Sequence, residues 1–147
     1  MDDELPEPGI TGRRTFRVEP EHTTTLFGEQ EGPPGLPAAT DATAEESVHV
    51  LGTPQLLASV EFLGRESLRG TLPKGTGLVG VEATVTHRSA VPIGVTVTIE
   101  TELTAVSGRR LTIEGTVQRS GSGRAVGEVT NRLQVVRREA FLDGIDR

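Results

Sequence analysis

Residues 50–69 carry an apolar stripe at helical spacing. Its members are Leu56, Leu57, Val60, Leu63 and Leu68. A stripe of this kind predicts one long helix that packs against another layer. Thr53 has the side chain of an N-cap, and Pro54 follows as a first helical residue, where a missing N–H costs nothing.

The rest of the chain alternates apolar and polar residues with the period of a strand. Phe16 and Val18 predict a first strand that ends at Pro20. After the helix, four further strands are expected within residues 77–90, 93–108, 109–123 and 124–138. On the first of these four, Val79, Val81, Ala83, Val85 and His87 share one face, with Gly80 and Glu82 on the other. Short turns between the strands predict an antiparallel meander.

The predicted order is therefore strand, loop, helix and four-strand meander, which is an α+β fold. One long helix covers the apolar face of a five-stranded antiparallel sheet. A single helix cannot also cover the edges of so long a sheet. Edge-to-edge pairing into a homodimer is the economical remedy.

A length of 147 residues fits one domain. Residues 1–11 are acidic and are expected to form a flexible tail, and residues 142–147 a C-terminal tail. Residues 28–47 are rich in Gly, Pro, Ala and Glu, which predicts a mobile loop or flap. The folded domain is expected to span residues 12–141.

Charge and composition exclude several classes of function. A formal net charge of −6 and four Phe with neither Tyr nor Trp argue against a nucleic-acid partner. The absence of Cys removes disulfides, thiol nucleophiles and zinc-thiolate sites. The acidic start lacks the features of a signal peptide, and no stretch is long enough to span a membrane, so a cytoplasmic location is expected.

Three side chains are candidates for chemistry: Thr53, Glu61 and His87. Each also has an ordinary explanation. Thr53 can be only a helix cap, Glu61 a carboxylate at the edge of the stripe that reaches water, and His87 a core or rim histidine. Together they supply a hydroxyl, a carboxylate and an imidazole between helix and sheet, the groups needed for acyl transfer. His22 and His49 show no metal-ligand spacing with His87, so neither a metal nor a resident cofactor is expected.

The segments TPQLLASVE, GLVGVEATVTHRSAVPIG and SGRRL, in this order, resemble the hot-dog fold thioesterases of the fluoroacetyl-CoA thioesterase type. In that family a Thr begins the helix, a Glu follows eight positions later, and a His lies 26 beyond the Glu; Thr53, Glu61 and His87 match without a gap. Gly80 also falls where the family carries a glycine. The resemblance covers roughly residues 12–141 and implies the hot-dog fold.

The resemblance implies hydrolysis of a small or medium acyl-CoA, with coenzyme A entering as part of the substrate. Glu61 would be the general base or the nucleophile. Thr53 would hydrogen-bond Glu61 or the substrate carbonyl, or accept the acyl group, and His87 would assist departure of the thiolate. Because hot-dog sites commonly lie between subunits, Thr53 and Glu61 of one chain are expected to face His87 of the other.

Substrate binding is assigned to Gly80, Pro54 and Arg88. The phosphates of coenzyme A need cations, and Arg88, Lys74, Arg65 and Arg124 are all possible partners. The fluoroacetyl-CoA enzyme places aromatic side chains in a lid before the helix, whereas residues 28–47 contain none. The fluoroacetyl preference is therefore not carried over, and the acyl group stays open.

Two other functions fit the same pattern. A hot-dog dehydratase acting on hydroxyacyl thioesters also uses a His and a carboxylate, but leaves Thr53 without a role. A non-catalytic module that binds acyl-CoA or an acyl carrier would hold Glu61 as a polar rim residue. A purely structural dimer domain would neither bind nor hydrolyse a thioester.

Overall fold

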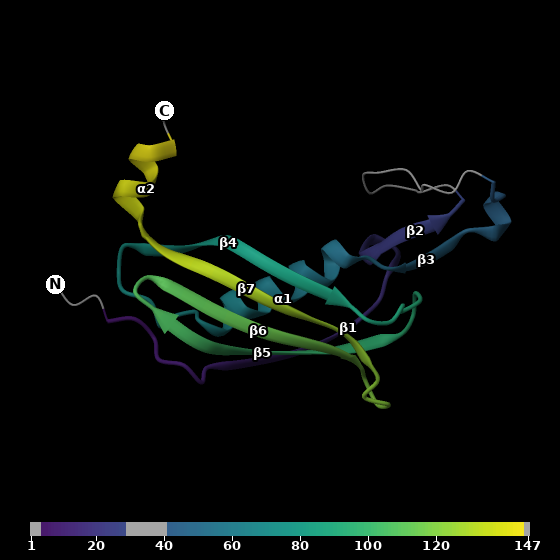
Figure 1. Ribbon diagram of the computed structural model, residues 1–147, viewed down its shortest axis with the longest axis horizontal. Helices are drawn as coiled ribbons and strands as arrows, with labels where there is room; N and C mark the ends of the chain where they lie inside the picture. Colours follow the sequence, from purple (N-terminus) through teal and green to yellow (C-terminus); the bar gives the residue numbers. More distant parts are fainter. Residues whose placement is uncertain (1–3, 29–40, 146–147) are drawn as a thin grey trace.

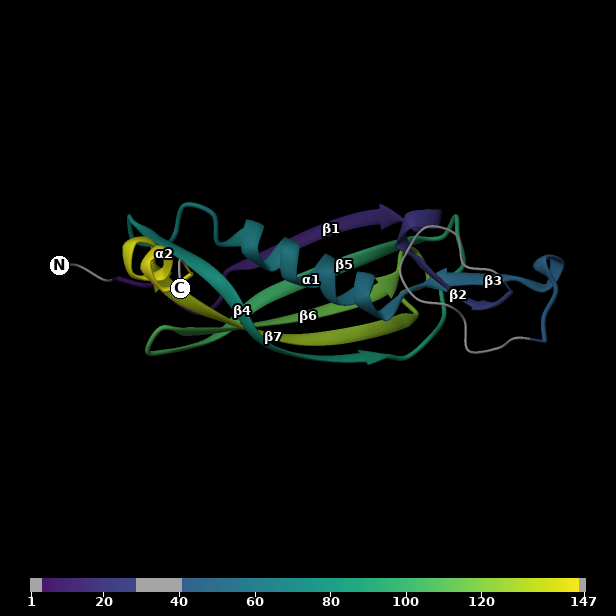
Figure 2. The ribbon, with the colours of Figure 1, turned by 90° about the horizontal axis from the view of Figure 1, so that it is seen from above.

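The computed structural model describes residues 4–28 and 41–145 and contains two helices, seven strands and two short 3-10 turns in that part of the chain. The strands are β1 (Thr11–Arg17), β2 (Thr23–Phe27), β3 (Val48–Leu51), β4 (Thr76–His87), β5 (Thr96–Ser107), β6 (Arg110–Arg119) and β7 (Ala125–Arg137). The helices are α1 (Thr53–Ser67) and α2 (Arg138–Ile145). The expected α+β architecture is confirmed, with α1 lying along one face of a five-stranded antiparallel sheet (Figures 1 and 2).

The strand order is β1-β5-β6-β7-β4, which corrects the predicted meander. Strands β5, β6 and β7 are joined by tight turns, one of them at Gly108 with a φ of 59°. Strand β4 instead pairs with β7 and lies at the sheet edge. Residues 88–95, which follow β4, are too many for a tight hairpin, and they carry the chain across to β5. The outer edge of β4 has no neighbouring strand in the described part of the chain.

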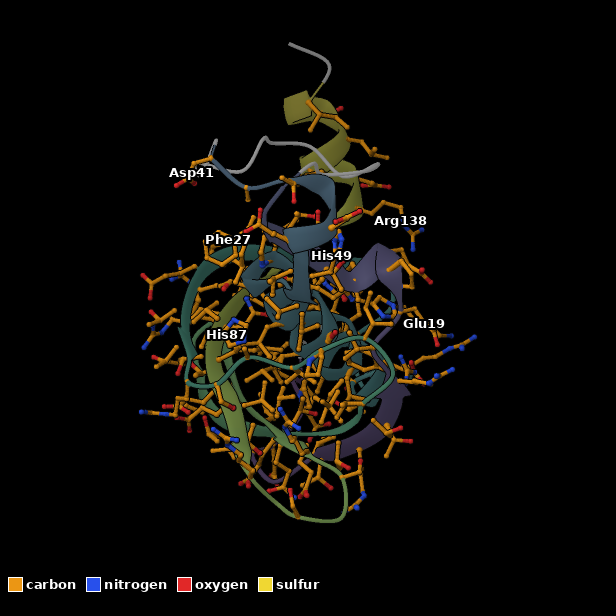
Figure 3. All side chains as sticks on the ribbon, turned by 90° about the vertical axis from the view of Figure 1, so that its right-hand side faces the viewer. Glu19, Phe27, Asp41, His49, His87 and Arg138 are labelled. Carbon is orange, nitrogen blue, oxygen red and sulfur yellow. The ribbon has the colours of Figure 1, made fainter. Side chains whose placement is uncertain are left out.

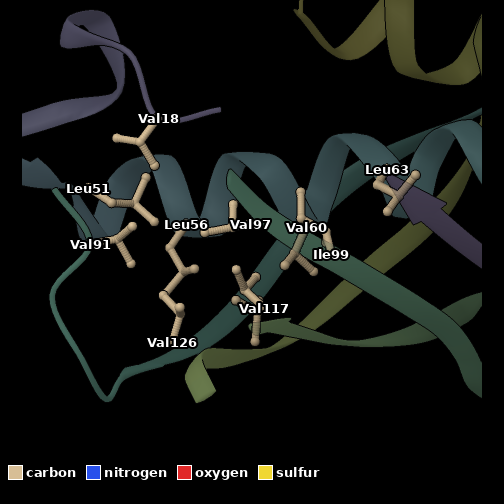
Figure 4. Close-up of a cluster of buried hydrophobic side chains, with 11 residues drawn as sticks. Val18, Leu51, Leu56, Val60, Leu63, Val91, Val97, Ile99, Val117 and Val126 are labelled. Carbon is tan, nitrogen blue, oxygen red and sulfur yellow. The ribbon is translucent and has the colours of Figure 1, made fainter. Parts of the chain in front are cut away.

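Helix α1 packs closely on the sheet through the predicted stripe. Leu56, Val60 and Leu63 are buried (Figure 4). Leu68 is also buried and is the C-cap residue of the helix. The approach is close because a glycine lies at the contact: a Cβ built on Gly115 of β6 would be 2.4 Å from Val60 Cγ1. Burying each of these aliphatic side chains stabilises the fold by about 1.5–3 kcal/mol.

Both ends of the chain are more structured than their composition suggests. Leu5 and Ile10 pack against the buried cluster around Leu103. Gly9 N donates to Leu103 O and Leu103 N donates to Ile10 O, each at 2.8 Å. Much of the expected acidic tail therefore lies against the domain, and α2 occupies residues up to Ile145 where a C-terminal tail was expected.

The segment expected to be a loop or flap, residues 28–47, is only partly described, because residues 29–40 lie outside the described ranges. On either side of it, β2 and β3 pair as a two-stranded sheet near the start of α1 (Figure 1). No helix in the described ranges is long and apolar enough to cross a membrane.

We expect the Gly115→Ala substitution to lower the free energy of unfolding by about 1–3 kcal/mol, because the new methyl group overlaps Val60 and pushes α1 off the sheet. Chemical denaturation monitored by circular dichroism measures this change. Gly144→Ala in α2 is the matched control, since a Cβ there meets nothing within 4 Å. Equal stability of the two variants would contradict the proposed close packing of helix on sheet.

Candidate active site

Thr53 does not cap α1, contrary to the sequence-based expectation. Gly52 is the N-cap residue, and Thr53 is the first residue of the helix, with Pro54 second. The Thr53 side chain is therefore free for another contact, and its Oγ1 lies 2.9 Å from His87 Nδ1. The start of α1 and the end of β4 thus form a hydroxyl–imidazole pair.

The second ring nitrogen of His87 has no partner in the described part of the chain. Nε2 is buried and makes no hydrogen bond there. Buried polar atoms are rarely left unsatisfied, because each costs a desolvation penalty. A substrate atom, a water molecule or a second chain must supply what Nε2 lacks. Figure 3 views this end of the molecule with His87 labelled.

Glu61 lies in the middle of α1 and is held by an arginine one turn later. Its Oε2 accepts a hydrogen bond of 3.2 Å from Arg65 Nε, and Arg65 Nη1 donates to Leu78 O at 2.8 Å. The Glu61 side chain is 24% exposed. The carboxylate is therefore oriented and partly shielded, at the margin of the apolar stripe rather than within the core.

A β-bulge brings Gly80 beside this carboxylate. Gly80 pairs with Leu133 and Glu82 with Arg132, so Val81 is an extra residue between them. Sequence alternation placed Gly80 on the face opposite His87 and Val81 on the apolar face. The bulge reverses the phase: a Cβ on Gly80 would lie 3.1 Å from Glu61 Oε1, while Val81 is 47% exposed. Gly80 and His87 therefore both face α1.

Asn131 of β7 is a buried polar residue beside the bulge that the sequence analysis missed. It is 1% exposed, and its Nδ2 donates to Glu82 O at 3.1 Å, next to the extra residue of the bulge. Its Oδ1 is buried without a partner in the described residues. A polar residue in phase with the buried Val129 and Leu133 was the available signal.

The three candidate groups do not meet within one chain. Thr53 and His87 are in contact, but Glu61 lies eight residues further along α1, a rise of about 12 Å. The expectation that Thr53 faces His87 of another chain is wrong, because its own chain supplies that histidine. One chain therefore presents two separate parts of a site, the Thr53–His87 pair and the Glu61–Gly80 contact.

The candidate phosphate ligands differ in what they already bind. Arg88 Nε donates to both carboxylate oxygens of Glu128, at 2.9 and 2.8 Å. These hydrogen bonds lower the pKa of Glu128 and raise the pKa of Arg88. Arg65 is engaged by Glu61 and Leu78 O. Lys74 instead lines a surface cavity at the start of β4.

Apolar side chains gather on the β2–β3 hairpin near the start of α1. Leu26 and Phe27 are each 45% exposed and Val48 is 40% exposed. Phe27 lies just before the segment in which no aromatic residue was found. Within residues 4–28 and 41–145, no group of three or more His, Cys, Asp or Glu residues could hold a metal ion.

Comparison with known proteins identifies the family of this chain. The family model described as fluoroacetyl-CoA-specific thioesterase matches residues 37–139. The fluoroacetyl-CoA thioesterase of Streptantibioticus cattleyicolor is 31% identical over 96 residues, which span 65% of this chain and 68% of that protein.

Solved structures extend the match over most of the chain. A crystal structure of a mutant of the fluoroacetyl-CoA-specific thioesterase in complex with fluoroacetate and CoA superposes with a TM-score of 0.73 at 26% identity, covering 92% of this chain and 99% of that one. A hot-dog-like protein from Thermanaerovibrio acidaminovorans, at 20% identity, has a TM-score of 0.73 and covers 96% and 90% of the two chains. The chain therefore belongs to the fluoroacetyl-CoA-specific thioesterase family, has the hot-dog fold and is an acyl-CoA thioester hydrolase.

Proposed function

We propose that this protein hydrolyses small or medium acyl-CoA thioesters at sites shared between the two chains of a homodimer. In each site, Thr53 and His87 come from one chain and Glu61 from its partner. The observation that carries this proposal is the unsatisfied, buried Nε2 of His87, in a chain whose own Glu61 lies at a distance. A second chain is the natural source of the carboxylate that this pair lacks, that of the partner's Glu61.

The free edge of β4 is the surface that makes such sharing possible. Gly80 to Thr84 form a continuous exposed run on this edge, and Phe62 of α1 is 60% exposed. An unpaired edge with apolar exposure favours pairing with a second chain. A two-fold axis perpendicular to the sheet pairs β4 antiparallel with its copy. That pairing directs Gly80 and Glu61 of one chain toward the His87 end of the other.

The groups have complementary roles in hydrolysis. Glu61 takes a proton from water as the water attacks the thioester carbonyl, or attacks that carbonyl itself. Collapse of the tetrahedral intermediate breaks the C–S bond, and the departing thiolate receives a proton, with His87 assisting that transfer. When Glu61 is the nucleophile, this step leaves an acyl–Glu61 anhydride, which water then hydrolyses. On either route the products are a carboxylic acid and coenzyme A.

The start of α1 supplies donors for the developing oxyanion. Pro54 has no N–H, and Leu56 N donates to Gly52 O at 3.0 Å. The Gln55 N–H is then assigned to the carbonyl oxygen. The Thr53 hydroxyl is assigned to it as well, because its proton is available when His87 Nδ1 is the donor in the Thr53–His87 contact. This use of Thr53 also distinguishes the thioesterase proposal from a dehydratase, which leaves the Thr53 hydroxyl without a catalytic role.

We expect Glu61→Gln to lower kcat for acyl-CoA hydrolysis by roughly 10²- to 10⁴-fold, because an amide cannot accept the proton or act as a nucleophile. Release of free thiol from a panel of acyl-CoAs measures the rate. Glu66→Gln is the matched control: Glu66 is on the same helix but exposed and ion-paired with Arg14. Full turnover by Glu61→Gln would exclude the assigned role of Glu61.

We expect Thr53→Ala and Glu61→Gln to complement each other in a mixed dimer. A shared arrangement leaves one site with Thr53, His87 and Glu61 all intact, so a purified heterodimer should have about half of the wild-type activity. Co-expression with two different affinity tags isolates the heterodimer. Activity no higher than that of the two parent variants would instead assign all three residues to one chain.

We expect Val81→Lys to weaken the dimer and to lower hydrolysis at dilute protein concentration, because a cation on the β4 edge opposes pairing. Sedimentation velocity measures the association state, and the thiol assay measures turnover. Arg13→Lys on β1, at the opposite edge of the sheet, preserves the positive charge at that position. It should change neither the association state nor the rate of turnover. A Val81→Lys protein that stays dimeric at the wild-type concentration would place the interface elsewhere.

A further inference from the structure

A cavity of about 320 Å³ opens at the start of β4 and the start of α2, far from the Thr53–His87 pair of the same chain. Lys74, Arg137 and Arg138 line it, together with one carboxylate, Glu139. An adjoining hollow shares Thr76 and Arg137 and adds a fourth cation, Arg109. A local excess of cations stands out in a chain with 21 acidic and 15 basic residues.

The walls of this cavity are held together by strand pairing and by hydrogen bonds to backbone carbonyl oxygens. Thr76 pairs with Arg137 across β4 and β7. Arg138 N donates to Gly75 O at 2.8 Å, and Thr76 Oγ1 donates to Pro73 O at 2.6 Å. The loop that carries Lys74 is thus tied to the junction that carries Arg138.

Two of the cations have no anionic partner in the described part of the chain. Lys74 and Arg138 form no ion pair there, in contrast with Arg65 and Arg88, which are bound to Glu61 and Glu128. Cations that converge on a recess without being neutralised are suited to a ligand with several negative charges.

We propose that this cavity binds the phosphate groups of the coenzyme A nucleotide. The inference rests on the proposed function, because the nucleotide is that of a thioester cleaved in the shared site. The cavity would hold the part of acyl-CoA that a carrier-bound thioester lacks, which is the 3′-phosphorylated nucleotide.

The position of the cavity fits the partner's site and not its own. Thr76 and His87 are separated by 11 strand residues, roughly 36 Å, which is longer than a pantetheine arm. Antiparallel pairing of β4 with its copy brings Thr76 close to the His87 end of the partner chain. One chain then contributes Glu61 and the phosphate cavity, and the other contributes Thr53 and His87.

Binding of free coenzyme A, dephospho-coenzyme A and pantetheine to the full chain, measured by isothermal titration calorimetry, tests the proposal without knowledge of the acyl group. We expect Lys74→Ala with Arg138→Ala to weaken coenzyme A binding by at least about tenfold and to leave pantetheine binding unchanged. The double substitution should reduce the affinity for dephospho-coenzyme A less than it reduces the affinity for coenzyme A. Arg13→Ala, an exposed cation on β1, is the control and should leave all three affinities unchanged.

The outcomes separate this inference from the proposed function. Unchanged coenzyme A affinity in the double variant, an equal loss for pantetheine, or no measurable coenzyme A binding by the wild type would overturn the phosphate assignment. Loss confined to the phosphorylated ligands, in a protein that hydrolyses no acyl-CoA, would support the cavity and refute the hydrolytic site. Unfolding curves of the double variant show whether it remains folded.

Discussion

The one extra residue in β4 determines what this fold presents to a substrate. Side chains seven positions apart on a regular strand point to opposite faces, so Gly80 and His87 would face opposite sides of the sheet. Val81 is not matched by a residue of β7, and this bulge turns both positions toward α1. The carboxylate of Glu61 then finds room at Gly80, while His87 reaches Thr53. Bulges at functional sites commonly redirect side chains in this way.

The elements of the fold could be predicted because each buries one face, and burial leaves a period in the sequence. The stripe of α1 is buried where it was expected, at Leu56, Val60 and Leu63. Periodicity does not identify the neighbour of a strand, which is why pairing of β4 with β7 was missed. An alternating pattern also assumes that every residue changes face with the next, so it could not detect that Val81 is an extra residue without a partner in β7.

The candidate site could be predicted in part, for a related reason. A Thr before a Pro at the start of a helix looks the same whether its hydroxyl caps the helix or binds a histidine on a distant strand. Gly52 takes the cap position here and leaves Thr53 to His87. Asn131 was overlooked because one polar residue barely weakens the pattern of a strand, although burial at 1% exposure makes its amide important for the bulge.

The proposed division of the site between two chains also has a physical rationale in the sheet edge. An unpaired edge strand exposes backbone donors and acceptors, and a carboxylate near it, such as Glu61, stays in contact with water. Pairing two copies of β4 would satisfy the backbone and remove water from Glu61 in a single step. A drier environment strengthens each hydrogen bond to the developing oxyanion. In the proposed shared arrangement, assembly and catalytic competence are one event, because the surface that makes a lone chain prone to association is also the surface that would complete the site.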